Sequence, residues 1–337
     1  NSISKYNLTK VFADYQDNYE EFDKKVSFSI ERISGAKLFR KYRKAYLINE
    51  YLMQNHKVQC VIADHWKSLE LIKTKKKKIC LIHSKEINHK KGSRLNFKVL
   101  EVLNNVDHIV ANSAFTKKLA INLGVEEKRI IVINPGVDPV NKIPKNDLNK
   151  AEEILKGKKH RLITVSRFEK RKNHEKVIMA IRNLKEIYPD IIYTCIGSGD
   201  DEENLKKLVI ELKLENQIIF LRDVPNDLKN ALVAKSNVFI MPSIIYKNSV
   251  EGFGIAFMEA ASYGTPSIGG SYGGASDAIS HNKTGLICNG DELSSIHDAV
   301  NNILDDKKFK IFGDSAKKFS ESFYWNKIVK KYLNLIN

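Results

Sequence analysis

Residues 241–261 read MPSIIYKNSVEGFGIAFMEAA, and this stretch decides how we expect the chain to fold. The apolar run Val238–Met241 predicts a short buried strand, and the strong helix formers from about Gly254 predict a helix. Gly252 and Gly254 bracket the turn between them, where missing side chains let a ligand approach the backbone. The start of a helix offers free N–H groups and a positive dipole end, which suit a phosphate or a sugar oxygen. The stretch therefore predicts a strand, a ligand-binding loop and a helix.

Two carboxylates frame this turn. Glu251 lies just before the helix, and Glu259 is the only charge among its apolar residues. An ionised carboxylate has two acceptor oxygens, a good match for neighbouring hydroxyls on a ribose or hexose. A carboxylate on so apolar a helix is costly unless something donates a hydrogen bond to it. A structural alternative stays open, in which Glu251 favours the helix N-terminus and Glu259 pairs with a buried Arg.

The spacing of these motifs resembles that of a known family. Glu251, seven residues and then Glu259 have Gly-Phe-Gly behind the first Glu. Other motifs follow the same order along the chain, in Val165–Lys172, Ile196–Gly199 and Gly273–Ile279. Together they resemble the family-four retaining glycosyltransferases of the GT-B fold, the glycosyl transferases group 1. The resemblance runs from roughly residue 26 to the end and implies an α/β fold of two Rossmann-like, doubly wound domains that face a central cleft.

For the donor sugar, the resemblance implies a role for both carboxylates. Glu259 would hold the nucleotide ribose. Glu251 would face the donor sugar, together with the backbone of Gly252, Phe253 and Gly254. Both carboxylates come from one loop and helix, whereas double displacement needs two carboxylates opposed across the sugar. Front-face transfer with retention is therefore what the family implies.

A basic segment matches the family's diphosphate-binding residues. Arg167 and Lys172 correspond to the Arg and Lys that grip the diphosphate, and Arg171 could share this role. Cations placed in advance stabilise the charge that develops when the sugar–phosphate bond breaks. The alternative is a solvated basic loop.

Three further residues are candidates for donor binding, and no metal site is expected. Gly197 fits a tight strand-to-helix turn near the nucleotide, and Val224 lies where the family reads the base with backbone groups. His83 matches the family's cleft-facing His that contacts the donor sugar. The acids at residues 200–203 are interpreted as first-turn residues favoured by the helix dipole rather than as a metal cluster. We therefore expect no metal and no cofactor, with the nucleotide-sugar as substrate.

The length predicts two domains, because 337 residues exceed what one core usually serves. Short apolar strands alternate with periodic helices, Trp66–Lys73 among the latter, which indicates parallel sheets covered on both faces. We predict an acceptor-side domain over residues 1–140, a nucleotide-sugar-binding domain over 141–322, and a terminal helix over 323–337 that crosses back to the first domain. The Pro-rich stretch Pro135–Lys158 is interpreted as the interdomain linker.

The N-terminal segment departs from the family pattern. The family begins with a strand and a glycine-rich loop over the donor phosphates, and neither is recognised before the strand candidate Val26–Ile30. The first residue is Asn1, so the N-terminus could be truncated. Absence of the loop would instead put catalytic competence in doubt.

The net charge of +16 is spread unevenly. Residues 1–145 hold 28 Lys and Arg against 15 Asp and Glu, a balance of +13, and the remainder holds 28 against 25, a balance of +3. The basic clusters at residues 40–44, 75–78 and 85–94 predict a rim that faces an anionic membrane leaflet carrying the acceptor. Aromatic residues do not interleave with these charges, so nucleic acid is not expected. A solvated surface of a lysine-rich protein is the alternative.

Composition points to the cytoplasm. Cys60, Cys80, Cys195 and Cys288 are scattered singly, as in a reduced protein, and no apolar run approaches the length of a membrane span. We therefore expect a cytoplasmic protein, peripheral on the inner membrane face.

The motifs together predict a retaining, metal-independent hexosyltransferase. It would move a hexose from a nucleotide-sugar to a glycan or lipid-linked saccharide in cell-surface polysaccharide or glycolipid synthesis. One alternative keeps the fold and changes the reaction, as in nucleotide-sugar epimerases. The other is a non-catalytic basic scaffold for membrane or nucleic acid, which the unrecognised glycine-rich loop favours.

Overall fold

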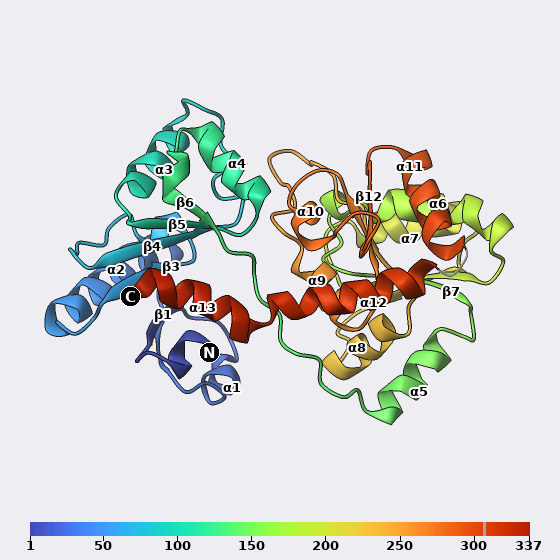
Figure 1. Ribbon diagram of the computed structural model, residues 1–337, viewed down its shortest axis with the longest axis horizontal. Coiled ribbons are helices and arrows are strands. Elements are labelled where there is room, and N and C mark those ends of the chain that lie inside the picture. The colour runs from blue at the N-terminus through green and yellow to red at the C-terminus, as the bar shows by residue number, and fades with distance from the viewer. Residues whose placement is uncertain (306–307) are drawn as a thin grey trace. The chain divides into compact units, whose positions relative to one another are not determined.

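The computed structural model describes residues 1–305 and 308–337, and the chain divides into two compact units. Unit 1 contains Asn1–Ile133 and Trp325–Asn337, and unit 2 contains Asn134–Tyr324. Each unit is built on its own parallel sheet (Figure 1). The division after Ile133 lies a little before the predicted domain boundary at residue 140.

Unit 2 contains a six-stranded parallel sheet in the order β12-β11-β10-β7-β8-β9. Its strands are β7 (His160–Val165), β8 (Ile191–Ile196), β9 (Ile218–Leu221), β10 (Val238–Met241), β11 (Ser267–Gly270) and β12 (Gly285–Cys288). The chain runs outward from β7 to β9 and then returns to place β10 on the other side of β7. Such a reversal is a topological switch point, where the loops after the two central strands separate and leave a crevice.

Helices cover both faces of this sheet. They are α5 (Lys145–Ile154), α6 (His174–Ile187), α7 (Glu202–Glu211), α8 (Asn226–Ala234), α9 (Ile255–Ser262), α10 (Ala275–Ala278), α11 (Leu293–Leu304) and α12 (Lys308–Ser320). Single 3-10 turns lie at Lys170–Lys172 and Glu321–Phe323. One hydrophobic cluster joins α6 and α11 to the sheet, and a second joins α5, α8 and α9 to it. Because both faces are covered, the strands are continuous apolar runs, and every residue of β8 is buried.

The predicted linker Pro135–Lys158 is wrong in its second half. Helix α5 occupies that half, and Ala151 and Leu155 are fully buried in the second cluster of unit 2. The apolar residues of α5 are few and stand among Lys, Asn and Glu, so its periodicity is weak in the sequence. The prolines lie before the helix, with Pro144 as its N-terminal flanking residue.

Unit 1 contains a four-stranded parallel sheet in the order β3-β4-β5-β6 and a separate parallel pair, β1 and β2. The strands are β1 (Lys10–Asp14), β2 (Ser29–Ile33), β3 (Cys60–Ala63), β4 (Lys77–Ile82), β5 (His108–Ala111) and β6 (Ile130–Val132). The helices are α1 (Tyr19–Asp23), α2 (Lys37–Gln54), α3 (Arg94–Asn104) and α4 (Ala114–Leu123), with 3-10 turns at Ile3–Lys5, Trp66–Ser68 and Glu127–Arg129. Ser93 and Ser113 cap α3 and α4 by accepting a backbone N–H bond each.

Two predictions for unit 1 are corrected. A strand does precede Val26, because β1 pairs with β2 from Lys10 to Asp14. This strand is only partly buried and has a single neighbour, so it lacks the apolar run that marks a central strand. The predicted helix Trp66–Lys73 is a single 3-10 turn. Trp66 is buried, and its indole N–H donates to the carbonyl of Glu86 at 2.9 Å.

The last helix, α13 (Trp325–Ile336), packs on unit 1. Its residues Ile328 and Ile336 are buried against Ile79 and Val110 of the sheet. The ammonium group of Lys77 donates to the carbonyls of Leu335 and Ile336, at 3.0 Å each. None of the helices that the structure describes combines the length and the apolar character needed to cross a membrane.

Candidate active site

The loop after β7 is fixed at the switch point of unit 2. Asn173 adopts a left-handed conformation (φ +63°), and its side-chain amide donates to the carbonyls of Pro242 (3.0 Å) and Gly290 (2.8 Å). The N–H of Ile244 donates to the carbonyl of Arg171 at 3.0 Å. The loop after β7 is therefore bound to the loops that follow β10 and β12.

At this place two cations meet one carboxylate. The Oε2 atom of Glu251 accepts from Nη1 of Arg171 at 2.7 Å and from Nζ of Lys172 at 2.6 Å. Arg171 and Glu251 are each 8% exposed. We call these three residues the charge cluster. These three residues carry a net positive charge, and Glu169 adds a longer ion pair to Arg171 at 3.6 Å.

Burial and pairing together shift the pKa values of Glu251 and Lys172. Burial alone raises the pKa of Glu251, but the neighbouring Lys172 and Arg171 outweigh it, so that pKa lies below its usual value. The pKa of Lys172 is lowered, because its burial and the charge of Arg171 outweigh the attraction of Glu251. The cluster is thus held ionised by its own pairing in a place that disfavours charge.

Glycines let the backbone close around Glu251. Gly254 has φ +85°, and a Cβ there would lie 2.5 Å from the ring of Phe257. A Cβ on Gly273 would overlap the carbonyl oxygen of Glu251, and the N–H of Gly274 donates to that oxygen at 2.8 Å. The predicted binding residue Phe253 is 2% exposed, with its ring 5.9 Å from that of Phe323. Its side chain therefore belongs to the core, and only its backbone remains for a ligand.

Glu259 lies on the exposed side of α9. Ile255 and Glu259 are the two exposed residues of this helix, one turn apart. The structural alternative, in which Glu259 pairs with a buried Arg, is wrong, because Glu259 is exposed. The buried Arg of the structural alternative exists, but it is Arg171, and it pairs with Glu251 instead.

Arg167 does not join the charge cluster. Its side chain is 72% exposed and pairs with Glu169 at 2.7 Å. Arg171, which the sequence offered only as an additional candidate, takes the buried position beside Lys172. The sequence could not separate the two, since both lie in one basic segment.

Gly197 and Val224 lie after the carboxyl ends of β8 and β9. A Cβ on Gly197 would overlap the carbonyl oxygen of Ser166, so glycine is required where β7 and β8 end side by side. Val224 is half-buried against the second hydrophobic cluster of unit 2. Both residues thus lie on the same edge of the sheet as the charge cluster.

His83 lies in unit 1, immediately after β4. Its side chain is exposed, and its backbone N–H donates to the carboxylate of Glu86. The next residue, Ser84, is buried with φ +92°, which is strained for a residue with a side chain. The loop thus holds His83 at the carboxyl edge of the unit 1 sheet.

A buried polar chain beneath the site was not found from the sequence. The Ser166 hydroxyl contacts Nε2 of His174 at 3.0 Å, Nδ1 of His174 contacts the Tyr193 hydroxyl at 2.9 Å, and that hydroxyl contacts Thr164 at 2.7 Å. Burial, with a smaller effect of Lys172, lowers the pKa of His174 to about 3. His174 is therefore a neutral group that ties α6 to the ends of β7 and β8. No motif in the sequence marks this chain.

The acids at residues 200–203 make ion pairs. Asp201 pairs with Lys170 at 3.1 Å, and Glu202 pairs with Arg222 at 2.6 Å. Within residues 1–305 and 308–337, no group of three or more His, Cys, Asp or Glu side chains could hold a metal ion. Metal independence stays a prediction.

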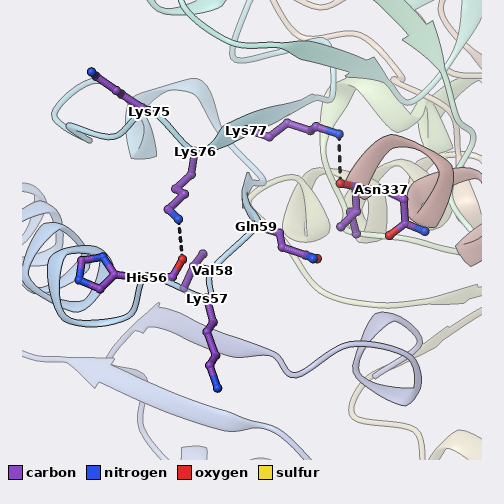
Figure 2. Close-up of a pocket in the computed structure, with 9 residues that line it drawn as sticks. His56, Lys57, Val58, Gln59, Lys75, Lys76, Lys77 and Asn337 are labelled. Carbon is purple, nitrogen blue, oxygen red and sulfur yellow. Dashed lines mark hydrogen bonds between the residues drawn. The ribbon is translucent and has the colours of Figure 1, made fainter.

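The predicted basic rim of unit 1 is divided between different places. On α2, Arg40 and Lys44 pair with Asp14, and Lys41 pairs with Glu70. Residues 75–77 line a pocket of about 430 Å³ at the amino-terminal ends of β3 and β4 (Figure 2). There the ammonium group of Lys76 donates to the carbonyl of His56 at 2.6 Å. Residues 85–94 instead follow the carboxyl end of β4.

Two models of known protein families match the chain. The model described as "Glycosyl transferases group 1" matches residues 145–322, and the model described as "Glycosyltransferase Family 4" matches residues 10–141. The chain therefore belongs to the family-four glycosyltransferases, the glycosyl transferases group 1.

Two curated relatives illustrate the kinship. The chain is 27% identical over 209 residues to the GDP-mannose-dependent alpha-(1-6)-phosphatidylinositol monomannoside mannosyltransferase of Mycolicibacterium smegmatis, covering 61% of this chain and 55% of the relative. It is 27% identical over 234 residues to the D-inositol 3-phosphate glycosyltransferase of Pseudarthrobacter chlorophenolicus, covering 67% and 54%. The aligned part thus spans about half the length of these relatives.

Solved structures agree on the fold. Anabaena Alr3699/HepE in complex with UDP superposes with a TM-score of 0.79 at 16% identity, covering 97% of this chain and 100% of that one. A glycosyltransferase from Rickettsia africae gives 0.79 at 20% identity, covering 98% of both chains. The fold is GT-B, with two Rossmann-like domains.

Proposed function

We propose that the protein is a retaining glycosyltransferase that moves a hexose from a nucleotide-sugar donor to a saccharide or lipid-linked acceptor. The observation that carries this proposal is the charge cluster of Arg171, Lys172 and Glu251 at the switch point between β7 and β10. Cleavage of a sugar–phosphate bond leaves negative charge on the diphosphate. Two preorganised cations that share Glu251 as their close counter-charge are suited to stabilise it.

The donor would be divided among these residues. Lys172 and Arg171 would contact the diphosphate, and Arg167, exposed at the end of β7, would join them through its free guanidinium donors. The exposed Glu259 would accept from the ribose hydroxyls. Glu251 uses Oε2 for both cations, and among the described residues no bond to its Oε1 is found, so Oε1 would accept from the donor sugar.

The same arrangement supports our proposal of retention and metal independence. Both acids lie on one loop and helix after β10, so neither is placed to attack from the opposite face of the sugar. The leaving phosphate would then act as base for the acceptor. The side chains of Arg171 and Lys172 supply the positive charge that a bound metal ion would otherwise provide. We therefore propose that the reaction requires no metal ion.

For the acceptor, the relatives supply a direction. Their names give phosphatidylinositol monomannoside and inositol 3-phosphate as what those proteins act on. For this chain we propose a glycan or lipid-linked saccharide, reached from the cytoplasmic side by peripheral docking of the basic unit 1 on an anionic leaflet. Each Lys or Arg near such a surface contributes about 1 kcal/mol.

The test is nucleotide-dependent stabilisation. A ligand that binds only the folded state raises the melting temperature. In a panel of UDP-, GDP- and ADP-sugars we expect at least one to do so, and Glu259→Ala to weaken the effect of that sugar and of its bare nucleotide alike. Glu211→Ala, which removes an exposed acid at the end of α7, is the matched control. If no nucleotide-sugar changes the melting temperature of the wild type, donor binding is refuted.

A further inference from the structure

Helix α2 exposes five large apolar side chains along one face. Their exposed fractions are 77% for Leu38, 62% for Phe39, 62% for Tyr42, 64% for Tyr46 and 61% for Met53. Residues four apart lie on the same side of a helix, and this spacing places Leu38, Tyr42 and Tyr46 together. Residues seven apart do so as well, which joins Phe39, Tyr46 and Met53. We call these five residues the α2 face.

The rest of α2 is attached to unit 1. Beside the α2 face, Ala45 and Leu52 are buried in the hydrophobic cluster of unit 1. Arg40 and Lys44 pair with Asp14 beside the two-stranded sheet. The α2 face is therefore the outward side of a fixed helix. A contiguous exposed apolar patch on such a surface indicates an interaction site, whereas scattered single residues do not.

The charges around the α2 face indicate what it contacts. Helix α2 contains five basic residues and one acidic residue, Glu50, within a segment of the chain that has a balance of +13. Of the basic residues, Lys37 and Arg43 are exposed, and Arg43, four residues after Phe39, borders the α2 face. A second copy of this chain would bring the same positive charge to the contact, which disfavours self-association. An anionic surface with an apolar interior complements both features.

We infer that the α2 face inserts into the interfacial layer of an anionic phospholipid bilayer. A helix with basic residues beside an aromatic and aliphatic face lies in the plane of the interface, with its apolar side among the acyl chains. Tyrosine suits this boundary, because its ring is apolar and its hydroxyl stays wet. The inference rests on the proposed docking of unit 1 and names the part that enters the bilayer.

The test compares apolar and electrostatic binding in the full chain. Co-sedimentation is measured with vesicles of phosphatidylcholine alone and of phosphatidylcholine mixed with phosphatidylglycerol. For the triple variant Phe39→Ser, Tyr42→Ser and Tyr46→Ser we expect about tenfold or greater loss of partition to the anionic vesicles. Ile210→Ser with Ile311→Ser removes apolar side chains that are 63% and 66% exposed on unit 2, and should leave partition unchanged.

Insertion itself has a direct readout in Phe39→Trp. On binding, the emission of this tryptophan should shift to the blue, and lipids brominated in the acyl chain should quench it more than the wild-type fluorescence from Trp66 and Trp325.

The contrary results distinguish failure of the insertion from failure of the docking proposal and from self-association. If the wild type binds anionic vesicles and the triple variant binds equally well, the inference is overturned and electrostatic docking survives. If the wild type ignores anionic vesicles even at low salt, the docking proposal itself fails. If instead the wild type self-associates and the triple variant does not, the α2 face contacts a second copy.

Discussion

Replacing Glu251 by Gln keeps the shape of the charge cluster and removes its only negative charge. Arg171 and Lys172 would then share a buried place without their close counter-charge, and only the longer pair of Arg171 with Glu169, at 3.6 Å, would remain. Breaking a buried ion pair from one side costs about 3–5 kcal/mol. The amide oxygen of Gln can still accept one of the two hydrogen bonds, worth about 1 kcal/mol, so we expect a loss of about 2–4 kcal/mol near neutral pH.

The loss of stability in the Glu251→Gln variant should depend on pH, and the direction of this dependence follows from the pKa of Lys172. Burial and Arg171 already lower the pKa of Lys172 and Glu251 opposes them, so removing Glu251 lowers that pKa further. A lysine with a lowered pKa binds fewer protons when folded than when unfolded, so stability rises with pH up to its ordinary pKa of about 10.4. The difference between variant and wild type should therefore shrink as the pH rises.

Chemical unfolding followed by circular dichroism, at about pH 7 and about pH 9.5, measures both effects. Glu259→Gln is the matched control, because it removes the other acid of the motif from an exposed position and should leave stability unchanged. A loss below about 1 kcal/mol that is equal at the two pH values would show that Glu251 does not hold the two cations.

Two more expectations concern the leaving group and the loop geometry. Lys172→Ala should remove about 2–4 kcal/mol of transition-state stabilisation, read as kcat/KM for the donor, and a fall of less than about tenfold would contradict its role. EDTA should leave turnover intact, and a full loss that Mg²⁺ or Mn²⁺ restores would overturn the metal-free proposal. Gly197→Ala should lower the free energy of unfolding by about 1–3 kcal/mol more than Gly157→Ala, because both positions have positive φ but only the first would overlap a backbone carbonyl. Equal losses in the two glycine variants would show that the close approach of β7 to β8 does not matter.

The fold of unit 2 could be predicted because its elements are buried on recognisable patterns. The strand Val238–Met241 begins and ends at the predicted residues, and the helix predicted from about Gly254 begins at Ile255. Continuous apolar runs mark strands covered on both faces, and an apolar stripe at helical spacing marks the helices that cover them. Where these signals weaken, as in β1 and α5, prediction failed.

The site was harder to predict than the fold. The sequence places Glu251 and Glu259 eight residues apart, but it does not say which side of α9 packs on the sheet, so it could not show that Glu251 is buried and Glu259 exposed. It also could not choose between Arg167 and Arg171, because the 3-10 turn that buries Arg171 is fixed by Asn173 and by loops far along the chain. Tertiary contacts decide such questions, and local patterns do not contain them.

The charge cluster joins residues about 80 positions apart, and this couples the site to the folding of unit 2. The chain between Arg171 and Glu251 contains β8 and β9 and returns to set β10 beside β7. A contact of this range has a large loop-closure entropy, which the packing of the sheet around it must offset. The same three residues would therefore report on substrate and on folding at once. A change in activity of a variant at any of these three residues can be interpreted only when the free energy of unfolding of that variant is measured on the same sample. The variant Lys172→Arg keeps the charge and separates the effect on substrate from the effect on folding.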